Sequence, residues 1–298
     1  MYSKAIIGYP RVGKLRELKF STERYFRGEE SKEQLETVAK SIREEQWILQ
    51  KNKGIDFIPS NDFSFYDNML DTIILLGAIP KEYKGLNLDI LDTYFAMARG
   101  YQGEKGDVKA LPMKKWFNTN YHYIVPMIED DMDFSCNVDN LVKYYKEALA
   151  LNIVTTPSII GPFTFLKLCR FNGKKGIDDV CYDILNVYVE ALAKLESLGV
   201  EIVQVQEPYL VMDLTEEDKK LFTNLYTKLF TDIKSVKIVL QSYFGDIRDI
   251  YEEVCKLGFY GIGIDFVEGK QSLSLIKEKG FPKEKLLLAG VVNGKNIW

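Results

Sequence analysis

Eight short runs of β-branched and aromatic residues recur along this chain, and longer stretches with helical periodicity separate them. The runs predict strands at residues 4–8, 55–60, 121–126, 153–161, 200–208, 236–244, 260–267 and 285–292. Strands that alternate with helices in this way are typical of an α/β fold with parallel strands, and eight repeats favour a closed (βα)8 TIM-type barrel.

A doubly wound open sheet is the alternative architecture for the same alternation. Such a sheet usually has a GxGxxG phosphate turn after its first strand. Here GYPRVGKL follows the first predicted strand, and its glycines, Gly8 and Gly13, have a different spacing, so the barrel is preferred. No helix is predicted after residues 285–292. Either one flank of the barrel is uncovered or, as we prefer, residues 1–298 are a single barrel domain truncated after strand eight of a longer polypeptide.

The composition is that of a globular protein with a sizeable core, with 46% hydrophobic and 28% charged residues. A net charge of −4 with scattered basic residues argues against a nucleic-acid partner. No apolar run approaches the roughly 20 residues that span a bilayer, which argues against a membrane partner. The four cysteines form no CxxC pair and no secretory signal is evident, which predicts reduced thiols and a cytoplasmic protein.

Few side chains are suited to a resident metal or to a hydrolytic triad. His122 is the single histidine and the cysteines are far apart in sequence, so a Cys/His zinc site is not expected. A Ser-His-Asp triad would also need His122, and no GxSxG motif accompanies it. The sequence therefore predicts no metal site in this chain and argues against a hydrolase.

The stretch GYPRVGKLRELK places four cations directly after the first predicted strand: Arg11, Lys14, Arg16 and Lys19. A helix predicted over residues 14–26 would bring Arg16 and Lys19 together near its N-terminus, where the helix dipole favours an anion. Its inward face would carry Leu15, Leu18, Thr22, Tyr25 and Phe26. The alternative is a solvated charged turn in which Glu17 and Glu23 balance the cations.

Several polar side chains follow predicted strands, at the positions where barrel enzymes hold functional groups. They are Asp62 after the second strand, Glu207 at the end of the fifth, Asp265 at the end of the seventh, and Asn293, Lys295 and Asn296 after the eighth. Asp62, Glu207 and Asp265 could form a paired-carboxylate site. For Asp62, and for Ser64 and Asp67 in the same segment, the simpler explanation is that they cap the next helix.

The segment KKWFNTNYHYIVP, residues 114–126, holds Lys115 ahead of the third predicted strand and His122 within it. Lys115 is either a loop cation that reaches a ligand or a solvent-facing lysine. A histidine surrounded by aromatic residues is more often a satisfied core residue than a catalytic one. His122 is therefore a candidate at the barrel end, with a core position as the alternative.

Seven motifs, in order along the whole chain, closely resemble the N-terminal half of the cobalamin-independent methionine synthases, which are 5-methyltetrahydropteroyltriglutamate–homocysteine methyltransferases. The motifs are GYPRVGKLRELK, DFSFYDNML, KKWFNTNYHYIVP, IIGPFTFLKL, QEPYL, QSYFGD and GVVNGKNIW. Each motif alone is weak, and the ordered set is highly specific.

This resemblance implies two similar (βα)8 barrels, face to face, that transfer a methyl group from a folate nitrogen to the sulfur of homocysteine. In the family the zinc, the homocysteine site and the acid group lie in the C-terminal barrel, so this chain would hold no cofactor and no catalytic residue, and that barrel would be its partner. An Arg-Glu-Leu-Lys run and the lysine before Trp-Phe bind the folate, chiefly its polyglutamate tail. In this sequence these residues are Arg16, Glu17, Leu18, Lys19 and Lys115.

One position departs from the family pattern, because Gln206 stands before Glu207 where an Asp is usual. The expected function is a folate-binding N-terminal barrel that is inactive alone. Two other hypotheses stay open: a self-sufficient barrel of the uroporphyrinogen-decarboxylase type that uses carboxylates at the strand ends, and a non-catalytic binding module.

Overall fold

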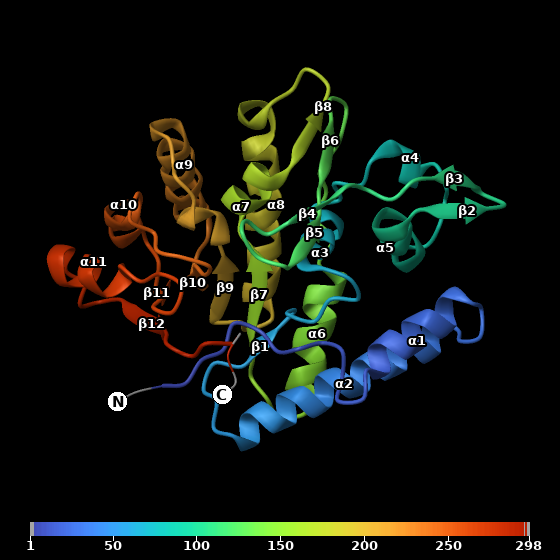
Figure 1. Ribbon diagram of the computed structural model, residues 1–298, viewed down its shortest axis with the longest axis horizontal. Coiled ribbons are helices and arrows are strands. Elements are labelled where there is room, and N and C mark those ends of the chain that lie inside the picture. Colours follow the sequence, from blue (N-terminus) through green and yellow to red (C-terminus); the bar gives the residue numbers. More distant parts are fainter. Residues whose placement is uncertain (1–2, 295, 297–298) are drawn as a thin grey trace. The chain divides into compact units, whose positions relative to one another are not determined.

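The computed structural model describes residues 3–294 and 296. The chain divides into two compact units, which are described separately below (Figure 1). Unit 1 comprises Met1–Tyr66 and Asp139–Ser158, and unit 2 comprises Asp67–Val138 and Ile159–Trp298. Strand β7, Thr156–Ile160, passes from the first unit into the second.

Unit 1 is built largely from the helices α1, Glu17–Phe26, α2, Lys32–Asn52, and α6, Asp139–Ala150. Strand β1, Pro59–Ser60, pairs in parallel with the first residues of β7. Helix α2 begins with a capping box, in which the Ser31 hydroxyl accepts the Gln34 N–H and the Gln34 side chain accepts the Ser31 N–H. This reciprocal pair is what an S-x-x-Q sequence favours at a helix start.

The core of unit 1 joins α2 to α6. Its buried apolar cluster consists of Trp47, Ile58, Tyr144, Ala148 and Ile153. Beside it, the guanidinium of Arg43 donates to the two carboxylate oxygens of Glu147 at 2.9 and 3.1 Å. The same guanidinium lies 4.2 Å from the centre of the Tyr144 ring and 5.1 Å from that of Phe63. Because Arg43 is only 1% exposed, this ion pair fastens the two helices from within.

Unit 2 contains the parallel sheet. Four strands lie side by side in sequence order and run parallel: β9, Ile202–Gln206, β10, Lys237–Gln241, β11, Gly261–Asp265, and β12, Leu286–Gly290. On the side of β9 away from β10, the neighbouring strand in the sheet is β7. The helices between and before them are α8, Ile177–Ser197, α9, Glu216–Asp232, α10, Tyr251–Lys256, and α11, Ser272–Lys279. Figure 1 shows α9, α10 and α11 in succession along this sheet. The predicted α/β fold with parallel strands is confirmed.

Smaller elements complete unit 2. The helices are α3, Asn68–Leu75, α4, Lys81–Lys84, α5, Ile90–Arg99, α7, Pro162–Leu168, and the 3-10 helix η1, Pro208–Val211. The strands form three pairs: β2, Tyr101–Gly103, with β3, Gly106–Val108; β4, Met113–Lys115, with β5, His122–Ile124; and β6, Met127–Glu129, with β8, Arg170–Asn172. The first two pairs are antiparallel and the third is parallel.

The predicted strands at 4–8 and 121–126 do not join the parallel sheet. Within 4–8 the structure has one isolated bridge, from Ala5 to Phe57. Within 121–126 the strand β5 belongs to an antiparallel hairpin, because the Ile124 N–H donates to the Asp67 carboxylate at 2.8 Å instead of to a neighbouring parallel strand. Strand β12 ends the order of the parallel sheet among the described strands. Closure into a barrel is therefore not shown by the pairing.

The helix predicted over residues 14–26 is observed, with a later start at Glu17. Leu18 is buried, as expected, but Leu15 is 77% exposed because it lies in the turn that precedes the helix. Phe26, the last helical residue, is 38% exposed. The predicted inward face is thus correct for Leu18 and wrong for Leu15.

Candidate functional site

Two of the four cations in the N-terminal motif are used inside unit 1. The Arg11 guanidinium donates to the backbone carbonyls of Phe65, at 3.3 Å, and Tyr66. The ammonium of Lys14 pairs with the carboxylate of Glu45 on α2. The Arg11 contacts hold the loop before α1, whereas the Lys14–Glu45 pair lies at the surface, with side chains 72% and 54% exposed.

The other two cations, Arg16 and Lys19, are exposed at the start of α1. Arg16 is the residue before the helix and has a left-handed backbone, with φ 65° and ψ 33°. No described carboxylate pairs with its guanidinium. Lys19 lies 3.8 Å from Glu23 in a solvent-exposed i,i+4 pair, and such pairs contribute only about 0.3–0.5 kcal/mol. Both cations are therefore available to an anion from solution.

Glu17 shapes the turn that carries Arg16. Its Oε2 accepts the Leu15 N–H at 3.0 Å, and it would lie 2.1 Å from a β carbon placed on Gly13, whose φ is +80°. Only glycine has neither the β carbon nor the conformational penalty at such a position. Leu18 faces the core, so within the Arg-Glu-Leu-Lys run the two cations face solvent while Glu17 and Leu18 fix the backbone.

Asp62 also supports this loop. Its Oδ2 accepts the Tyr9 N–H at 2.8 Å, and burial raises the pKa of its carboxyl to about 7 against that hydrogen bond. The proposed helix cap in this segment is instead Asp67, whose Oδ1 accepts the Leu70 N–H at 2.8 Å at the start of α3. Capping is confirmed for Asp67, whereas Asp62 ties the segment before α1 to the segment after β1.

Glu207, at the end of β9, is fully buried. Its carboxylate accepts the backbone N–H groups of Phe163 at 3.0 Å and Thr164 at 2.6 Å, and the Tyr226 hydroxyl at 2.6 Å. Burial raises the pKa of the Glu207 carboxyl to about 7, and the hydrogen bonds act in the opposite direction. Because its oxygens are enclosed by donors of its own unit, Glu207 anchors the start of α7 to the sheet.

Asp265, at the end of β11, braces two loops. Its Oδ2 accepts the Phe244 N–H at 3.0 Å, and its Oδ1 accepts the N–H groups of Val267 and Glu268 at 2.8 and 2.9 Å. Gln206, where the family pattern has an Asp, accepts the Tyr243 hydroxyl at 2.6 Å through its side chain. The carboxylates of Asp62, Glu207 and Asp265 thus all accept hydrogen bonds from donors of their own unit. Few of their oxygen lone pairs remain for paired-carboxylate chemistry.

Lys115 and His122 are partners in the β4–β5 register. Both side chains are exposed, so His122 is not a core residue. No described carboxylate forms an ion pair with either one. Asn293, which follows β12, is exposed and its carbonyl accepts the Asn296 N–H at 3.3 Å. Lys295 lies outside the described residues.

Sequence reasoning missed an aromatic cluster that joins three loops of unit 2. Phe117 lies in the β4–β5 turn, Tyr209 follows β9, and Phe244 follows β10. The Phe117 ring lies 5.9 Å from Tyr209 and 6.1 Å from Phe244, and the exposed Tyr121 stacks on Phe244 at 6.4 Å. Phe117 and Phe244 both have a left-handed backbone, with φ 48° and 79°, which is a genuine outlier for bulky residues. The sequence could have indicated this cluster, because an aromatic residue follows each of the strands β4, β9 and β10 within three residues.

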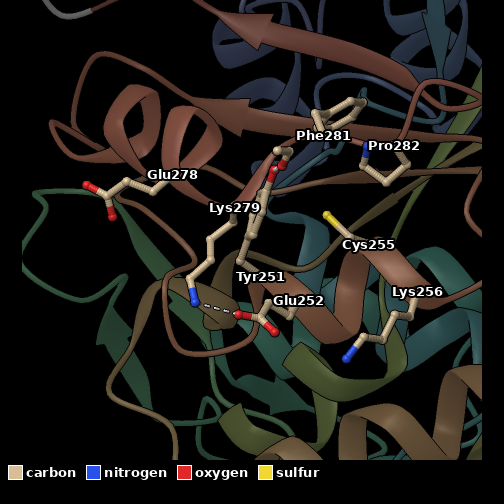
Figure 2. A pocket seen from close by; sticks show the side chains of 9 residues that line it. Tyr251, Glu252, Cys255, Lys256, Glu278, Lys279, Phe281 and Pro282 are labelled. Atoms are coloured by element: carbon tan, nitrogen blue, oxygen red, sulfur yellow. Dashed lines mark hydrogen bonds and ion pairs between the residues drawn. The ribbon is translucent and has the colours of Figure 1, made fainter.

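Each unit also contains a larger cavity. In unit 1 a cavity of about 560 Å³ lies between α1 and α2 and is lined in part by Leu15, Glu17 and Phe20. In unit 2 a cavity of about 540 Å³ lies beside α10 and the segment before β12, with Lys279 and Glu252 paired at 2.7 Å across it (Figure 2). The second cavity is at the amino end of β12, opposite the strand ends where α/β proteins bind ligands.

Within residues 3–294 and 296, no group of three or more His, Cys, Asp or Glu side chains is placed to hold a metal ion. No helix in the same described part of the chain is long and apolar enough to cross a bilayer. Each unit therefore holds its own candidate residues: the exposed cations Arg16 and Lys19 in unit 1, and the exposed side chains of Lys115 and His122 in unit 2.

Comparison with known proteins identifies the family of this chain. Residues 3–298 match the family model of the cobalamin-independent synthase N-terminal domain. The chain belongs to this family. Among curated relatives it is similar to the 5-methyltetrahydropteroyltriglutamate–homocysteine methyltransferases of Lactococcus lactis subsp. lactis (55% identity), Campylobacter jejuni subsp. doylei (52%) and Streptococcus pneumoniae (51%). Each match covers 99% of this chain and 39% of the relative.

Solved structures agree at the level of the fold. A putative vitamin-B12-independent methionine synthase from Listeria monocytogenes matches with a TM-score of 0.67 at 12% identity, over 99% of this chain and 83% of that one. A B12-independent methionine synthase from Shewanella sp. W3-18-1 matches with a TM-score of 0.61 at 14% identity, over 88% and 72%. The chain spans about two fifths of the length of its curated relatives.

Proposed function

We propose that this chain is the folate-binding N-terminal domain of a methyltransferase that moves a methyl group from 5-methyltetrahydropteroyltriglutamate to homocysteine to make methionine. The names of the curated relatives support this proposal. So does the division of the N-terminal cations, because Arg11 donates to backbone carbonyls and Lys14 is paired with Glu45, while no described carboxylate pairs with Arg16 and Lys19 has only a 3.8 Å surface pair. That division is the observation that carries the proposal.

The ligand part recognised here is the anionic tail of the folate. Each glutamate added to the tail brings a carboxylate, and a hydrogen bond to a charged group contributes about 1.5–3 kcal/mol. In unit 1, Arg16 and Lys19 supply cationic donors without competing strong ion pairs, and Lys115 is the corresponding candidate donor of unit 2. A longer tail should therefore bind more tightly, while the reacting nitrogen of the folate is held elsewhere.

The chemistry is assigned to the part of the relatives that this chain does not cover. A thiol substrate needs activation, which a zinc ion supplies by stabilising the thiolate, and the proposed zinc and homocysteine sites belong to a C-terminal partner barrel. The chain described here should bind the tail and should not transfer the methyl group. We also propose that residues 1–298 form one (βα)8 barrel in the cytoplasm, which the likeness to the solved methionine synthases and the cysteine pattern support.

The uroporphyrinogen-decarboxylase alternative depends on free carboxylates at strand ends. Glu207 is enclosed by three donors and Asp265 accepts three backbone N–H groups. Neither arrangement favours that chemistry, and methyl-group transfer in the larger enzyme is the better-supported function.

The test is calorimetric titration of this chain with methyltetrahydrofolate that carries one or three glutamates, at low and high salt. We expect tighter, salt-sensitive binding of the three-glutamate form, and loss of that preference in Arg16→Ala/Lys19→Ala. The matched control is Arg27→Ala/Lys40→Ala. It removes the same two charge types from unit 1, including a lysine in a 3.6 Å i,i+4 pair with Glu44 that resembles the pair of Lys19.

Equal binding of the one- and three-glutamate ligands by the unmodified chain would contradict the proposal. So would an equal loss in the control variant, because that would indicate a general effect of net charge. Methyl transfer to homocysteine by this chain with added zinc, well above background, would contradict the assignment of the chemistry to the partner barrel.

A further inference from the structure

We infer that the cavity beside α10 in unit 2 is a binding site for a free α-amino acid with an apolar side chain, held by the ion pair of Lys279 and Glu252 that spans it. Such a ligand is a zwitterion. Its carboxylate would pair with the Lys279 ammonium, and its ammonium would pair with the Glu252 carboxylate. This site is separate from the folate site and does not depend on the proposed function.

The first support is the size and lining of the cavity. Its volume of about 540 Å³ lies within the range of roughly 300–1,000 Å³ that is usual for small-molecule sites. Part of its wall is a face of α10 that includes Tyr251 and Cys255, and another part is the segment 280–282, which leads to β12 (Figure 2). Cys255, Phe281 and Pro282 are half-buried, so a ligand from solution can reach the apolar surface that they form.

The second support is the presence of one charge of each sign on the lining. Lys279 Nζ lies 2.7 Å from Glu252 Oε1, and the two side chains are 50% and 51% exposed. Their hydrogen bond lowers the pKa of the Glu252 carboxyl and raises the pKa of the Lys279 ammonium, so both groups are charged at neutral pH. An ion pair this exposed to solvent is held weakly. A ligand can therefore separate the two groups at little cost.

The charge pattern selects a zwitterion over a ligand with a single charge. An anion that pairs with Lys279 would also lie close to the Glu252 carboxylate, and a cation that pairs with Glu252 would lie close to the Lys279 ammonium. Like charges at such short range repel each other. An amino acid gives each protein group a partner of opposite charge, and hydrogen bonds between charged groups are the strong ones.

The third support is that the walls of the cavity are fixed before any ligand binds. The Tyr251 hydroxyl, at the start of α10, donates to the Gly280 carbonyl. The Lys285 ammonium donates to the carbonyl of Leu257, which caps the end of α10, and to that of Phe259 at 2.9 Å. Both ends of α10 are thus joined to the segment between α11 and β12. A preformed cavity loses little conformational freedom when it binds a ligand.

The side chain of the ligand would lie against the apolar surface formed by Cys255, Phe281 and Pro282. A thioether side chain is unbranched, adapts to an irregular surface and makes favourable contacts with aromatic rings. L-Methionine is therefore the probe for this site.

The experiment is calorimetric titration of this chain with L-methionine, N-acetyl-L-methionine and L-methionine methyl ester. Each derivative lacks one of the two charges. We expect L-methionine to bind about tenfold more tightly than either derivative, the scale of one charge-assisted hydrogen bond. L-Alanine keeps both charges but has too short a side chain to cover the apolar surface, so its affinity should also be about tenfold lower.

Variants of the ion pair test which group recognises which charge. Glu252→Gln should weaken L-methionine about tenfold and should have little further effect on N-acetyl-L-methionine, which has no ammonium. Lys279→Gln should do the same for the methyl ester, which has no carboxylate. The matched controls are Lys277→Gln and Glu278→Gln, at exposed residues of α11, and Figure 2 shows Glu278 directed away from the ion pair. Both controls should bind L-methionine as the unmodified chain does, and circular dichroism of each variant checks that the fold is retained.

Alkylation of the thiols locates the bound ligand. L-Methionine should slow the reaction of Cys255 with iodoacetamide, measured by mass spectrometry, because it covers that part of the wall. Cys136 is also half-buried and does not line this cavity, so its reaction rate should not change.

Several results would overturn the inference. They are a lack of L-methionine binding, an affinity for either derivative equal to that for L-methionine, and unchanged binding in both Glu252→Gln and Lys279→Gln. An equal loss in Lys277→Gln or Glu278→Gln would also count against it, because it would indicate an effect of net charge. Selective loss in the two ion-pair variants, together with protection of Cys255, would support the amino-acid site.

Discussion

The carboxylate of Glu207 occupies the space that a β carbon on Gly161 would need. A β carbon built there would lie 2.1 Å from Oε1 and 2.3 Å from the carboxyl carbon. Gly161 follows β7 and caps the start of α7, and Glu207 follows β9, so the two residues let the strand ends and the start of a helix approach closely. The glycine in this motif is required by packing, since its own φ of −76° is accessible to any residue.

Gly161→Ala should therefore destabilise the protein by about 1–3 kcal/mol, the usual cost of overpacking a dense site. The new methyl group must displace the Glu207 carboxylate from its three donors or shift α7. Urea unfolding followed by circular dichroism measures this cost. Gly294→Ala, at a position with open space, is the control, and an equally small effect in both variants would contradict the packing argument.

Glu207 should make stability depend on pH. Its pKa in the folded protein is about 7, above the ordinary 4.5, so between those values the folded state binds more protons than the unfolded state. The stability that this group contributes is fully present below about pH 4.5 and is lost as the pH rises through about 7. Glu207→Gln should have a shallower loss of unfolding free energy between pH 5 and pH 8 than the unmodified protein.

The comparison variant for this prediction is Glu201→Gln, at an exposed carboxylate one residue before β9. Its pH profile should follow that of the unmodified protein. If Glu207→Gln and Glu201→Gln give the same slope, the Glu207 carboxyl does not titrate in this range.

Asp62 should control the order of the loop that carries Arg16. Asp62→Ala removes the acceptor of the Tyr9 N–H, so amide hydrogen exchange at Tyr9 and through residues 11–16 should become faster. The affinity for the three-glutamate folate should fall with it, because Arg16 and Lys19 are then held less firmly. Asp62→Asn is the control, because it keeps a carbonyl oxygen that can accept the Tyr9 N–H, and the loop amides of this variant should exchange slowly. Unchanged amide exchange in Asp62→Ala would show that the loop is held by its other contacts.

The buried ion pair of Arg43 and Glu147 should respond asymmetrically to mutation. Glu147→Ala leaves the Arg43 guanidinium buried without its carboxylate, which typically costs about 3–5 kcal/mol. Replacing both residues, in Arg43→Met/Glu147→Leu, should cost much less. Glu44→Ala is the comparison, since loss of its surface pair with Lys40 should change the unfolding free energy by less than about 1 kcal/mol. Equal losses of unfolding free energy in Glu147→Ala and Glu44→Ala would contradict this account.

The later part of the fold was predictable because its strands are short runs rich in Ile, Val and Leu between longer helical stretches. The predicted strands at 200–208, 236–244, 260–267 and 285–292 each contain an observed parallel strand. Such runs pair with their sequence neighbours through right-handed crossovers, so local pattern and tertiary pairing agree. For 121–126 they disagree, because a distant Asp67 takes the Ile124 N–H, and a contact across so long a separation leaves no trace in local periodicity.

The candidate site was predictable to the level of residue type. The motif around residue 16 indicated a cluster of cations, but only the structure separates Arg11, which donates to backbone carbonyls, from the exposed Arg16. Glu207 and Asp265 stand at strand ends, as predicted, and their roles depend on backbone N–H groups from other loops. The sequence identifies the carboxylate residues, but it does not show which backbone amides donate to them.

Strand β12 has a practical consequence for protein engineering. Leu286 and Leu287 are 39% and 40% exposed, and no described strand pairs with the outer edge of β12. An unpaired edge presents backbone donors and acceptors ready for another strand. A tethered peptide with alternating apolar residues could therefore be added to this edge by main-chain hydrogen bonding. A split reporter fused near β12 would detect any strand that pairs with the same edge.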